Sequence, residues 1–209
     1  MIMTADLSPH DARSPDRTLT AAAEIFARHG MHGPSMAVLA REITGRTGGD
    51  VIAFRRAYPT RLDLVYAVAL DATRSLVAAQ TTDSGGIDPA ATRLGRLVRR
   101  HVAHCWEHRT AEELRRTLQP TLRAINPARH RELSALRRDY RGFIRDLIGD
   151  GMAEGDFRVA DPAAASGAVL DTLDSTFNWY DGDGGMSVTE LGDVCVDLIV
   201  HHQLGAERG

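Results

Sequence analysis

The amino-acid sequence predicts an all-α protein of about nine helices, and three observations support this fold class. Alanine is plentiful while aromatic residues make up only 5% of the 209 residues, a balance that favours helices over sheets. Apolar residues recur at the spacing of one helix face. Capping residues, glycines and prolines separate these periodic segments. No segment has the alternating pattern of a strand, and no internal repeat is visible.

The first four predicted helices follow a short tail. Residues 1–16 are polar and contain prolines, which predicts disorder. Ser35 is placed to cap the second helix, Gly48 and Gly49 break it, and Asp50 is placed to cap the third. The expected spans are residues 17–29, 36–47, 51–57 and 61–79.

Five further helices fill the rest of the chain. Asp161 followed by Pro162 opens the eighth, because proline fits the first helical position. Ser187 and Glu190 have the spacing of a capping box at the start of the ninth. Pro120 is expected to kink or end the sixth helix. The expected spans are residues 90–107, 111–125, 127–154, 162–180 and 188–204.

Composition and motifs exclude several classes of protein. No apolar run approaches the length of a membrane span, and the amino terminus lacks the apolar core of a signal peptide. Two cysteines, Cys105 and Cys195, are too few for a disulfide framework, so we expect a cytoplasmic protein. The sequence has no H-E-x-x-H, no paired E-x-x-H, no phosphate-binding glycine loop and no nucleophile elbow. We therefore expect neither an enzyme nor a bound cofactor.

Charged residues fall into blocks along the chain. All 25 basic residues are arginine. Residues 41–61 hold five arginines against two acidic residues, and residues 93–145 hold fourteen against five. Residues 146–209 hold only two arginines against thirteen acidic residues. The two basic blocks are candidate sites for anionic partners.

The short third helix predicts DNA binding. A helix, a tight break and a second short helix form the helix-turn-helix plan, in which the second helix enters the major groove. Phe54 is expected to face inward, which leaves the other side chains to contact bases and phosphates. A small helical corner with a solvated basic face is the alternative interpretation. The expected DNA-binding residues are Ser35, Val51, Ile52, Arg55, Arg56, Tyr58, Thr60 and Arg61.

Three stretches of the amino-terminal region together form a known pattern. They are "LTAAAEIFARHGMHGPSM", "LAREI" and "FRRAYPTRLDLVYAVAL". They resemble the DNA-binding domain of the TetR family of bacterial repressors, over residues 17–75. The resemblance implies a helix-turn-helix domain over residues 17–60 and a ligand-binding and dimerisation domain over residues 61–209.

The same resemblance assigns roles to single residues. Asp50 takes the place of the family's capping serine, Phe54 that of its buried leucine, and Thr60 and Arg61 that of its phosphate-contacting Ser-Lys pair. The sequence departs from the family in two ways. Arg55 stands where the family usually has an aromatic residue, and the segment before the break is about four residues longer, close to one helical turn.

The resemblance further implies a homodimer that binds a palindromic operator on double-stranded DNA. In the family the last two helices usually form half of a four-helix bundle between protomers. Apolar stripes on the eighth and ninth helices supply the expected interface, although both stripes can instead face the chain's own core. The interface residues are Leu170, Leu173, Phe177, Leu191, Val194 and Leu198.

A small-molecule effector is also implied. The segment "DSTFNWYDGDGGMS" resembles the Trp-containing segment of TetR relatives that respond to acyl-CoA thioesters, and the block 93–145 can attract their phosphates. Ion pairing with the acidic carboxy-terminal block is the alternative interpretation. The candidate apolar lining of the effector pocket is Trp106, Phe143, Phe177 and Trp179.

One predicted helix also carries a candidate metal site. His101, His104, Cys105 and His108 share a helix face, and imidazole and thiolate ligands suit zinc, nickel or copper. Three of the four lie on the apolar stripe of that helix, so the alternative is that they line the core or pocket. Two functions thus remain: a TetR-like repressor released by an effector, and a small-molecule or metal-binding sensor or carrier that does not bind DNA.

Overall fold

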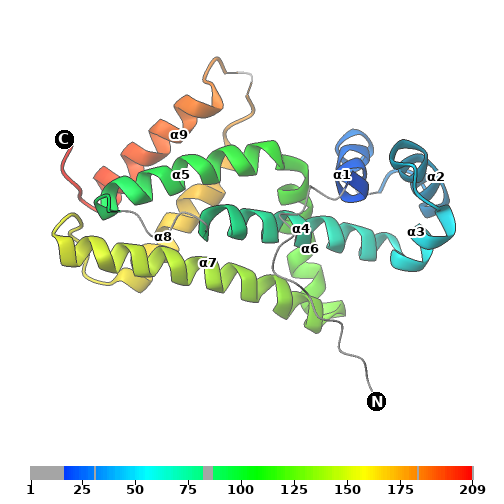
Figure 1. Ribbon diagram of the computed structural model, residues 1–209, viewed down its shortest axis with the longest axis horizontal. Helices are drawn as coiled ribbons and strands as arrows, with labels where there is room; N and C mark the ends of the chain where they lie inside the picture. Colours follow the sequence, from blue (N-terminus) through cyan, green and yellow to red (C-terminus); the bar gives the residue numbers. More distant parts are fainter. Residues whose placement is uncertain (1–16, 31, 82–86, 183, 209) are drawn as a thin grey trace. The chain divides into compact units, whose positions relative to one another are not determined.

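The computed structural model describes residues 17–30, 32–81, 87–182 and 184–208, apart from the side chains of Thr81 and Phe177. The expected tail over residues 1–16 lies outside the described residues. The chain divides into two compact units (Figure 1), an amino-terminal unit that ends at Val68 and a carboxy-terminal unit that begins at Ala69. This boundary lies within one continuous helix.

The amino-terminal unit is built from three helices and the start of a fourth. Ser35 caps α2 through its hydroxyl, and Gly48 ends it in a left-handed conformation with φ of 75°. Asp50 caps α3. A shared apolar core is formed by Ile25, Phe26, Leu39, Ile43 and Phe54. The helices are α1 (Arg17–His29), α2 (Met36–Thr47), α3 (Val51–Ala57) and α4 (Arg61–Thr81).

The carboxy-terminal unit is a helical bundle. Helix α5 packs against α9 and α7, and α7 also packs against α8 and α6 (Figure 1). One large apolar cluster joins α5, α7, α8 and α9. The elements are α5 (Ala90–Glu107), α6 (Arg109–Ile125), α7 (Pro127–Glu154), α8 (Pro162–Ser175), the 3₁₀ turn η1 (Thr176–Asn178), α9 (Val188–Val196) and the π-helical turn η2 (Asp197–Gln203).

The all-α prediction is confirmed, since the described residues form helices, turns and loops without a strand. The capping box of Ser187 and Glu190 is also present. None of the described helices has the length and apolar content needed to span a membrane.

Pro120 does not end its helix, and the ends of the last two helices differ from their prediction. Pro120 lies inside α6 without ending it; the residue is exposed, so water can satisfy the carbonyl that its ring leaves unpaired. Helix α8 ends at Ser175 instead of residue 180. Here the Ser175 and Thr176 hydroxyls donate to backbone carbonyls at 2.7 Å, which tightens the chain into a 3₁₀ turn. The last helix widens after Val196 into η2.

Candidate DNA-binding face and effector site

Helix α3 is a seven-residue helix fixed at both ends. The Asp50 carboxylate accepts the Ala53 N–H at 2.7 Å. The Tyr58 N–H donates to the Phe54 carbonyl at 2.8 Å. Phe54 is buried, and its ring centroid lies 5.1 Å from that of Tyr58. Because this anchor occupies one side of the helix, the other sides face solvent.

The exposed side of α3 combines apolar and basic groups. Ile52 is 72% exposed. Arg55 and Arg56 are exposed, and within the described part of the chain neither has a hydrogen-bond or ion-pair partner. Val51 is half-buried beside them. Four of the predicted contact residues are therefore brought together on one short helix.

The predicted phosphate contacts at the start of α4 have partners within the chain. The Thr60 hydroxyl and N–H both donate to the Asp63 carboxylate, at 2.6 and 2.8 Å, and the hydroxyl accepts the Asp63 N–H at 3.2 Å, which caps α4. The Arg61 guanidinium donates to the carbonyls of Gly33 and Pro34. Both residues thus stabilise the unit itself, and their contact with DNA stays a prediction.

Helix α2 contributes groups that the sequence reasoning missed. Ser35 is engaged as its cap, its hydroxyl accepting the Val38 N–H at 3.4 Å. Val38 is itself 46% exposed. Arg41, three residues further along, is exposed, and its guanidinium has no partner among the described residues. Its position in the basic block 41–61 was the signal that could have identified it.

Two other arginines of this unit have a structural role. Arg28 pairs with Glu42 at 3.0 Å, and Arg46 pairs with Glu24. Both pairs join α1 to α2. They are partly exposed, so each stabilises the unit only slightly.

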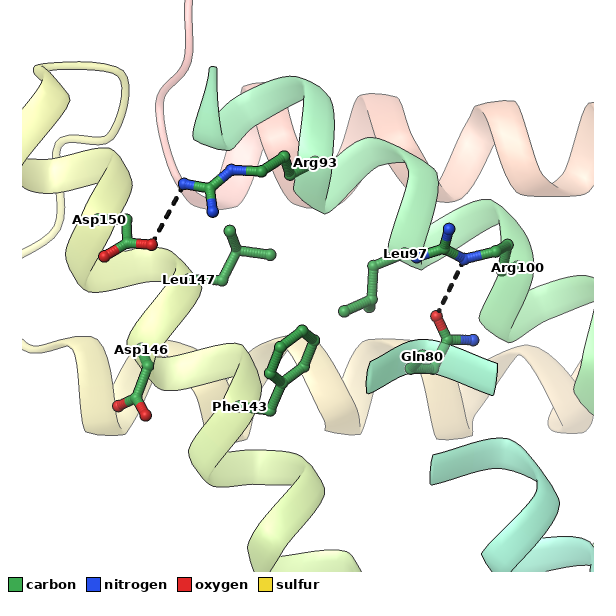
Figure 2. A pocket seen from close by; sticks show the side chains of 8 residues that line it. All are labelled: Gln80, Arg93, Leu97, Arg100, Phe143, Asp146, Leu147 and Asp150. Carbon is green, nitrogen blue, oxygen red and sulfur yellow. Dashed lines mark hydrogen bonds and ion pairs between the residues drawn. The ribbon is translucent and has the colours of Figure 1, made fainter. Parts of the chain in front are cut away.

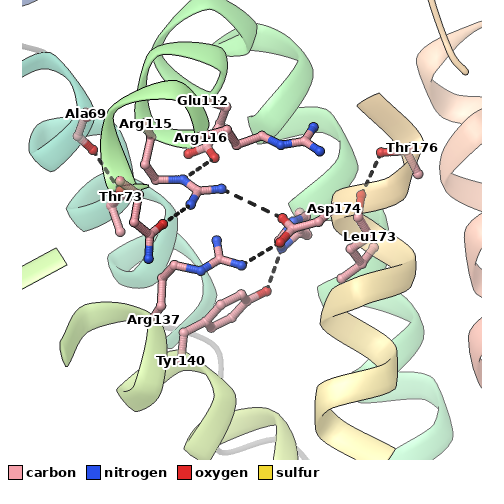
Figure 3. Close-up of polar contacts among 12 residues, drawn as sticks. Ala69, Thr73, Glu112, Arg115, Arg116, Arg137, Tyr140, Leu173, Asp174 and Thr176 are labelled. Carbon is pink, nitrogen blue, oxygen red and sulfur yellow. Dashed lines mark hydrogen bonds and ion pairs between the residues drawn. The ribbon is translucent and has the colours of Figure 1, made fainter. Parts of the chain in front are cut away.

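The carboxy-terminal unit contains a buried charge cluster (Figure 3). Arg115 donates to Glu112 at 2.8 Å, and both side chains are almost fully buried. Arg115 also lies 3.8 Å from Asp174, which accepts a hydrogen bond from Arg137 at 2.6 Å. The cluster joins α6, α7 and α8. Because removing one member would leave a buried charge without its partner, these four residues depend on one another.

The predicted metal ligands diverge from one another. His101 Nδ1 lies 2.9 Å from the Tyr140 hydroxyl. His104 and His108 stack at 4.2 Å, and His108 Nδ1 lies 3.0 Å from the His104 carbonyl. Burial raises the pKa of the Cys105 thiol well above its usual value, which opposes thiolate formation. Within the described residues, no group of three or more such side chains is arranged to hold a metal ion.

Burial also determines the protonation state of His101 and of its neighbours on α5. It lowers the pKa of His101 to about 4, so the imidazole is neutral near pH 7. Burial likewise lowers the pKa of His104 and raises that of Tyr140. Of the three residues that the alternative interpretation placed on the apolar stripe, His101 and Cys105 are buried in the core and His108 is half-buried.

A pocket of about 80 Å³ lies among α4, α5 and α7 (Figure 2). Polar and charged side chains stand at its two ends, with apolar side chains between them. Arg93 pairs with Asp150 at 3.2 Å at one end, and Arg100 Nε donates to Gln80 at 3.4 Å at the other. The lining residues are Gln80, Arg93, Leu97, Arg100, Phe143, Asp146, Leu147 and Asp150.

The predicted aromatic lining residues are spread over different places. Phe143 lines this pocket. Trp106 lines a smaller cavity of about 10 Å³, packs against Tyr180 at 4.8 Å and lies under the Arg109 guanidinium. Trp179 is 54% exposed, and the side chain of Phe177 lies outside the described residues. The structure thus does not gather the described members into one pocket, and the two polar ends of the larger pocket were not predicted.

Ion pairing is extensive in the basic block 93–145. At least seven of its fourteen arginines pair with acidic side chains, and most of the partners lie beyond residue 145. This arrangement favours the ion-pairing interpretation of the block. The pairs are Arg93–Asp150, Arg93–Glu154, Arg96–Asp88, Arg99–Asp193, Arg109–Glu113, Arg115–Glu112, Arg137–Asp174 and Arg145–Asp146.

The residues of the predicted dimer interface differ in their exposure. Leu170, Leu173 and Leu191 are buried in the protomer's own core. Val194 and Leu198, on α9 and η2, are each 44% exposed. The exposed pair continues the same helical run and is the part of the stripe open to a second copy.

The family described as "Tetracyclin repressor-like, C-terminal domain" matches residues 88–202, more than half of the chain. No curated protein matches the chain significantly. Among solved structures, the TetR family transcriptional regulator PfmR from Thermus thermophilus has 26% identity and a TM-score of 0.75, over 92% of this chain and 100% of that one.

Two further solved structures share the fold at lower identity. The ketosteroid transcriptional regulator KstR2 of Mycobacterium tuberculosis has 17% identity and a TM-score of 0.71, over 98% of this chain and 100% of that one. AibR, solved in complex with isovaleryl coenzyme A and operator DNA, has 17% identity and a TM-score of 0.66, over 88% of this chain and 96% of that one.

Proposed function

Because the chain belongs to the TetR family of transcriptional regulators, we propose that it is a homodimeric repressor that holds operator DNA through α3. A small-molecule effector bound in the carboxy-terminal unit releases it. This is a binding function without catalysis, and it places the protein in the cytoplasm with its DNA.

The observation that carries the proposal is the exposed side of α3. Arg55 and Arg56 carry charge that no described residue neutralises, on a helix held in place by Phe54. Arginine forks bind guanine edges and phosphates, and Ile52 offers an apolar contact of the kind that thymine methyl groups take. Arg41 on α2 supplies a further phosphate contact.

A homodimer presents two copies of α3 to the DNA. One two-turn helix contacts few base pairs, so a two-fold pair of such helices about 34 Å apart reads a palindromic operator. The exposed Val194 and Leu198 are the proposed contact between protomers. Changing both to aspartate places charges in an apolar interface, and we expect a monomer of unchanged helix content. Sedimentation of both forms measures this, and an unaltered mass distribution refutes the interface.

The effector acts by preferring a protomer geometry that does not fit the operator. Helix α4 begins in the amino-terminal unit and continues into the carboxy-terminal unit, so it is the covalent link for this coupling. The solved complex of AibR with isovaleryl coenzyme A and operator DNA supports an acyl-CoA thioester as the effector class. The 80 Å³ pocket is far smaller than the several hundred Å³ of a typical ligand site, so it admits only the acyl end of such a molecule.

A footprint of the protein on its own upstream DNA tests the function, repeated with a panel of acyl-CoA thioesters. We expect protection of a palindrome, lost in the double variant Arg55→Ala and Arg56→Ala and relieved by one member of the panel. The control is Arg123→Ala, which removes an exposed arginine of the carboxy-terminal unit.

A sensor or carrier that does not bind DNA is the second candidate. It is favoured by the intramolecular partners of Thr60 and Arg61, the two residues at the predicted phosphate contacts. Acyl-CoA binding without any footprint, at low salt and on genomic fragments, would establish this alternative in place of the repressor.

A further inference from the structure

The middle of the pocket in Figure 2 is apolar. Leu97 of α5 and Phe143 and Leu147 of α7 lie between its two polar ends. Leu97 and Leu147 are buried, whereas Phe143 is half-buried. The Phe143 ring is therefore the apolar lining group with the most surface left for an occupant to cover, and covering it removes apolar surface from water.

The charged groups of this pocket oppose an anionic occupant. At one end the Arg93 guanidinium is already bonded to Asp150 at 3.2 Å and to Glu154 at 3.3 Å. Asp146 and Asp150 both line the pocket, and a ligand carboxylate placed beside them would be repelled. The lining therefore favours a chain that carries no charge at its inner end.

The size of the pocket limits the length of the chain. An apolar cavity of about 150 Å³ holds benzene, and the volume of about 80 Å³ here is roughly half of that, which is room for about three or four carbon atoms. A longer chain would lie against the guanidinium and carboxylate groups at the ends and remove them from water, which costs free energy. The pocket therefore discriminates by length as well as by charge.

We propose that this pocket binds an uncharged alkyl chain of about three or four carbon atoms, and that Phe143 sets the preferred chain length. The chain lies against Phe143, Leu97 and Leu147, and its polar head group stays outside the pocket. A free short-chain fatty acid and its coenzyme A thioester share this chemistry. Naming the occupant an effector rests on the proposed function, whereas the chain length and the lack of charge rest on the pocket alone.

Calorimetric titration of the full-length protein without DNA tests the proposal. The probes are acetyl, butyryl, valeryl, octanoyl and glutaryl coenzyme A, together with free acetate and valerate. We expect affinity to rise about fourfold for each methylene group from acetyl to valeryl, and not to rise further at octanoyl. Glutaryl coenzyme A matches the valeryl thioester in length but ends in a carboxylate, so it should bind at least about tenfold more weakly than the valeryl thioester.

Two substitutions of Phe143 should move the preferred length in opposite directions. Phe143→Ala enlarges the pocket, so octanoyl coenzyme A should bind more tightly than the valeryl thioester. Phe143→Trp fills the pocket, so the butyryl and valeryl thioesters should lose their advantage over the acetyl thioester. The control is Phe157→Leu, which changes the same apolar cluster without touching the pocket lining and should keep the native order. The order compares ligands on one protein, so a loss of stability alone does not change it.

Valerate binding more tightly than acetate identifies the free acid as a source, and a gain confined to the thioesters identifies coenzyme A derivatives. Four results would overturn the proposal: no gain from acetyl to valeryl in either series, a continued rise to octanoyl, equal binding of the glutaryl and valeryl thioesters, or an unchanged order in both Phe143 variants. The DNA footprint is a separate measurement. A protein that footprints without this length preference loses this inference only, and one that prefers valeryl without a footprint loses the repressor function only.

Discussion

The exposed faces of α2 and α3 and the buried charge cluster of the carboxy-terminal unit use arginine in opposite ways. On the exposed faces of α2 and α3, Arg41, Arg55 and Arg56 lack partners among the described residues. In the carboxy-terminal unit, Arg115 is almost fully buried between Glu112 and Asp174, and many surface arginines are paired as well. The side chain is the same, but its surroundings decide whether it is available to a partner outside the chain.

The difference has a physical basis. A guanidinium ion removed from water needs a carboxylate beside it, and the desolvation cost is recovered only with good geometry. An exposed guanidinium keeps its hydration and can exchange it for phosphate or base contacts. A count of arginines therefore says little about anion binding, and the list of their partners says much more.

The buried cluster should be far more sensitive than the surface. We expect Glu112→Gln to lower the free energy of unfolding by about 3–5 kcal/mol, because it leaves Arg115 buried without its closest carboxylate. Urea unfolding followed by tryptophan fluorescence measures this, since both tryptophans lie in the carboxy-terminal unit. The adjacent Glu113, 57% exposed and paired with Arg109, is the control. Glu113→Gln should lower the free energy of unfolding by at most about 1 kcal/mol. Equal losses of stability in the two variants would contradict the difference between buried and exposed pairs.

The neutral histidine should make stability depend on pH. The pKa of His101 is lowered to about 4 in the folded protein, from 6.5 in the unfolded chain, so the unfolded chain binds more protons between these values. The contribution of His101 to the free energy of unfolding, up to about 3 kcal/mol, is complete above pH 6.5 and is lost as the pH falls towards 4. His104, whose pKa is also lowered, acts in the same direction. Urea midpoints at pH 7.5 and 4.5 should differ less in His101→Gln than in the native protein, and an identical pH dependence would contradict this assignment.

The smallest effect concerns the end of α3. Asp50→Ala removes the cap that accepts the Ala53 N–H, which we expect to destabilise α3 by about 1 kcal/mol. Hydrogen exchange of the α3 amides is the appropriate measurement, because it reports local opening within one unit. Asp50→Ser should retain most of the protection. If the α3 amides exchange at the same rate in the Asp50→Ala and Asp50→Ser variants, the cap does not stabilise this helix.

The local part of the fold was predictable from the sequence. Ser35, Asp50 and Ser187 cap the helices that they were expected to cap, because a cap depends on residues only two or three positions away. Phe54 was expected inside for the same kind of reason, namely its place in a short helical period. Pro120 was expected to kink or end its helix, and it does not end α6; whether a helix continues past a proline depends on its surroundings, which the local sequence does not specify.

The partners of long polar side chains were not predictable. Nothing near Arg61 in the sequence indicates that it reaches the carbonyls of Gly33 and Pro34. Gln80 attracted no prediction, and Arg93 was predicted only as one member of the basic block 93–145, yet both line the pocket. Such contacts join residues far apart in the chain, and their choice depends on tertiary packing instead of on local pattern.

The contrast between free and paired arginines is tested most directly by the salt dependence of operator binding. The slope of log affinity against log salt falls by about 0.9 for each phosphate contact removed, and a lost base contact lowers the affinity itself. The double variant Arg55→Ala and Arg56→Ala should bind at least about tenfold more weakly, with a shallower slope, while Arg99→Ala, whose arginine pairs with Asp193, should match the native protein. If affinity and slope are both unchanged in the double variant, α3 does not read DNA.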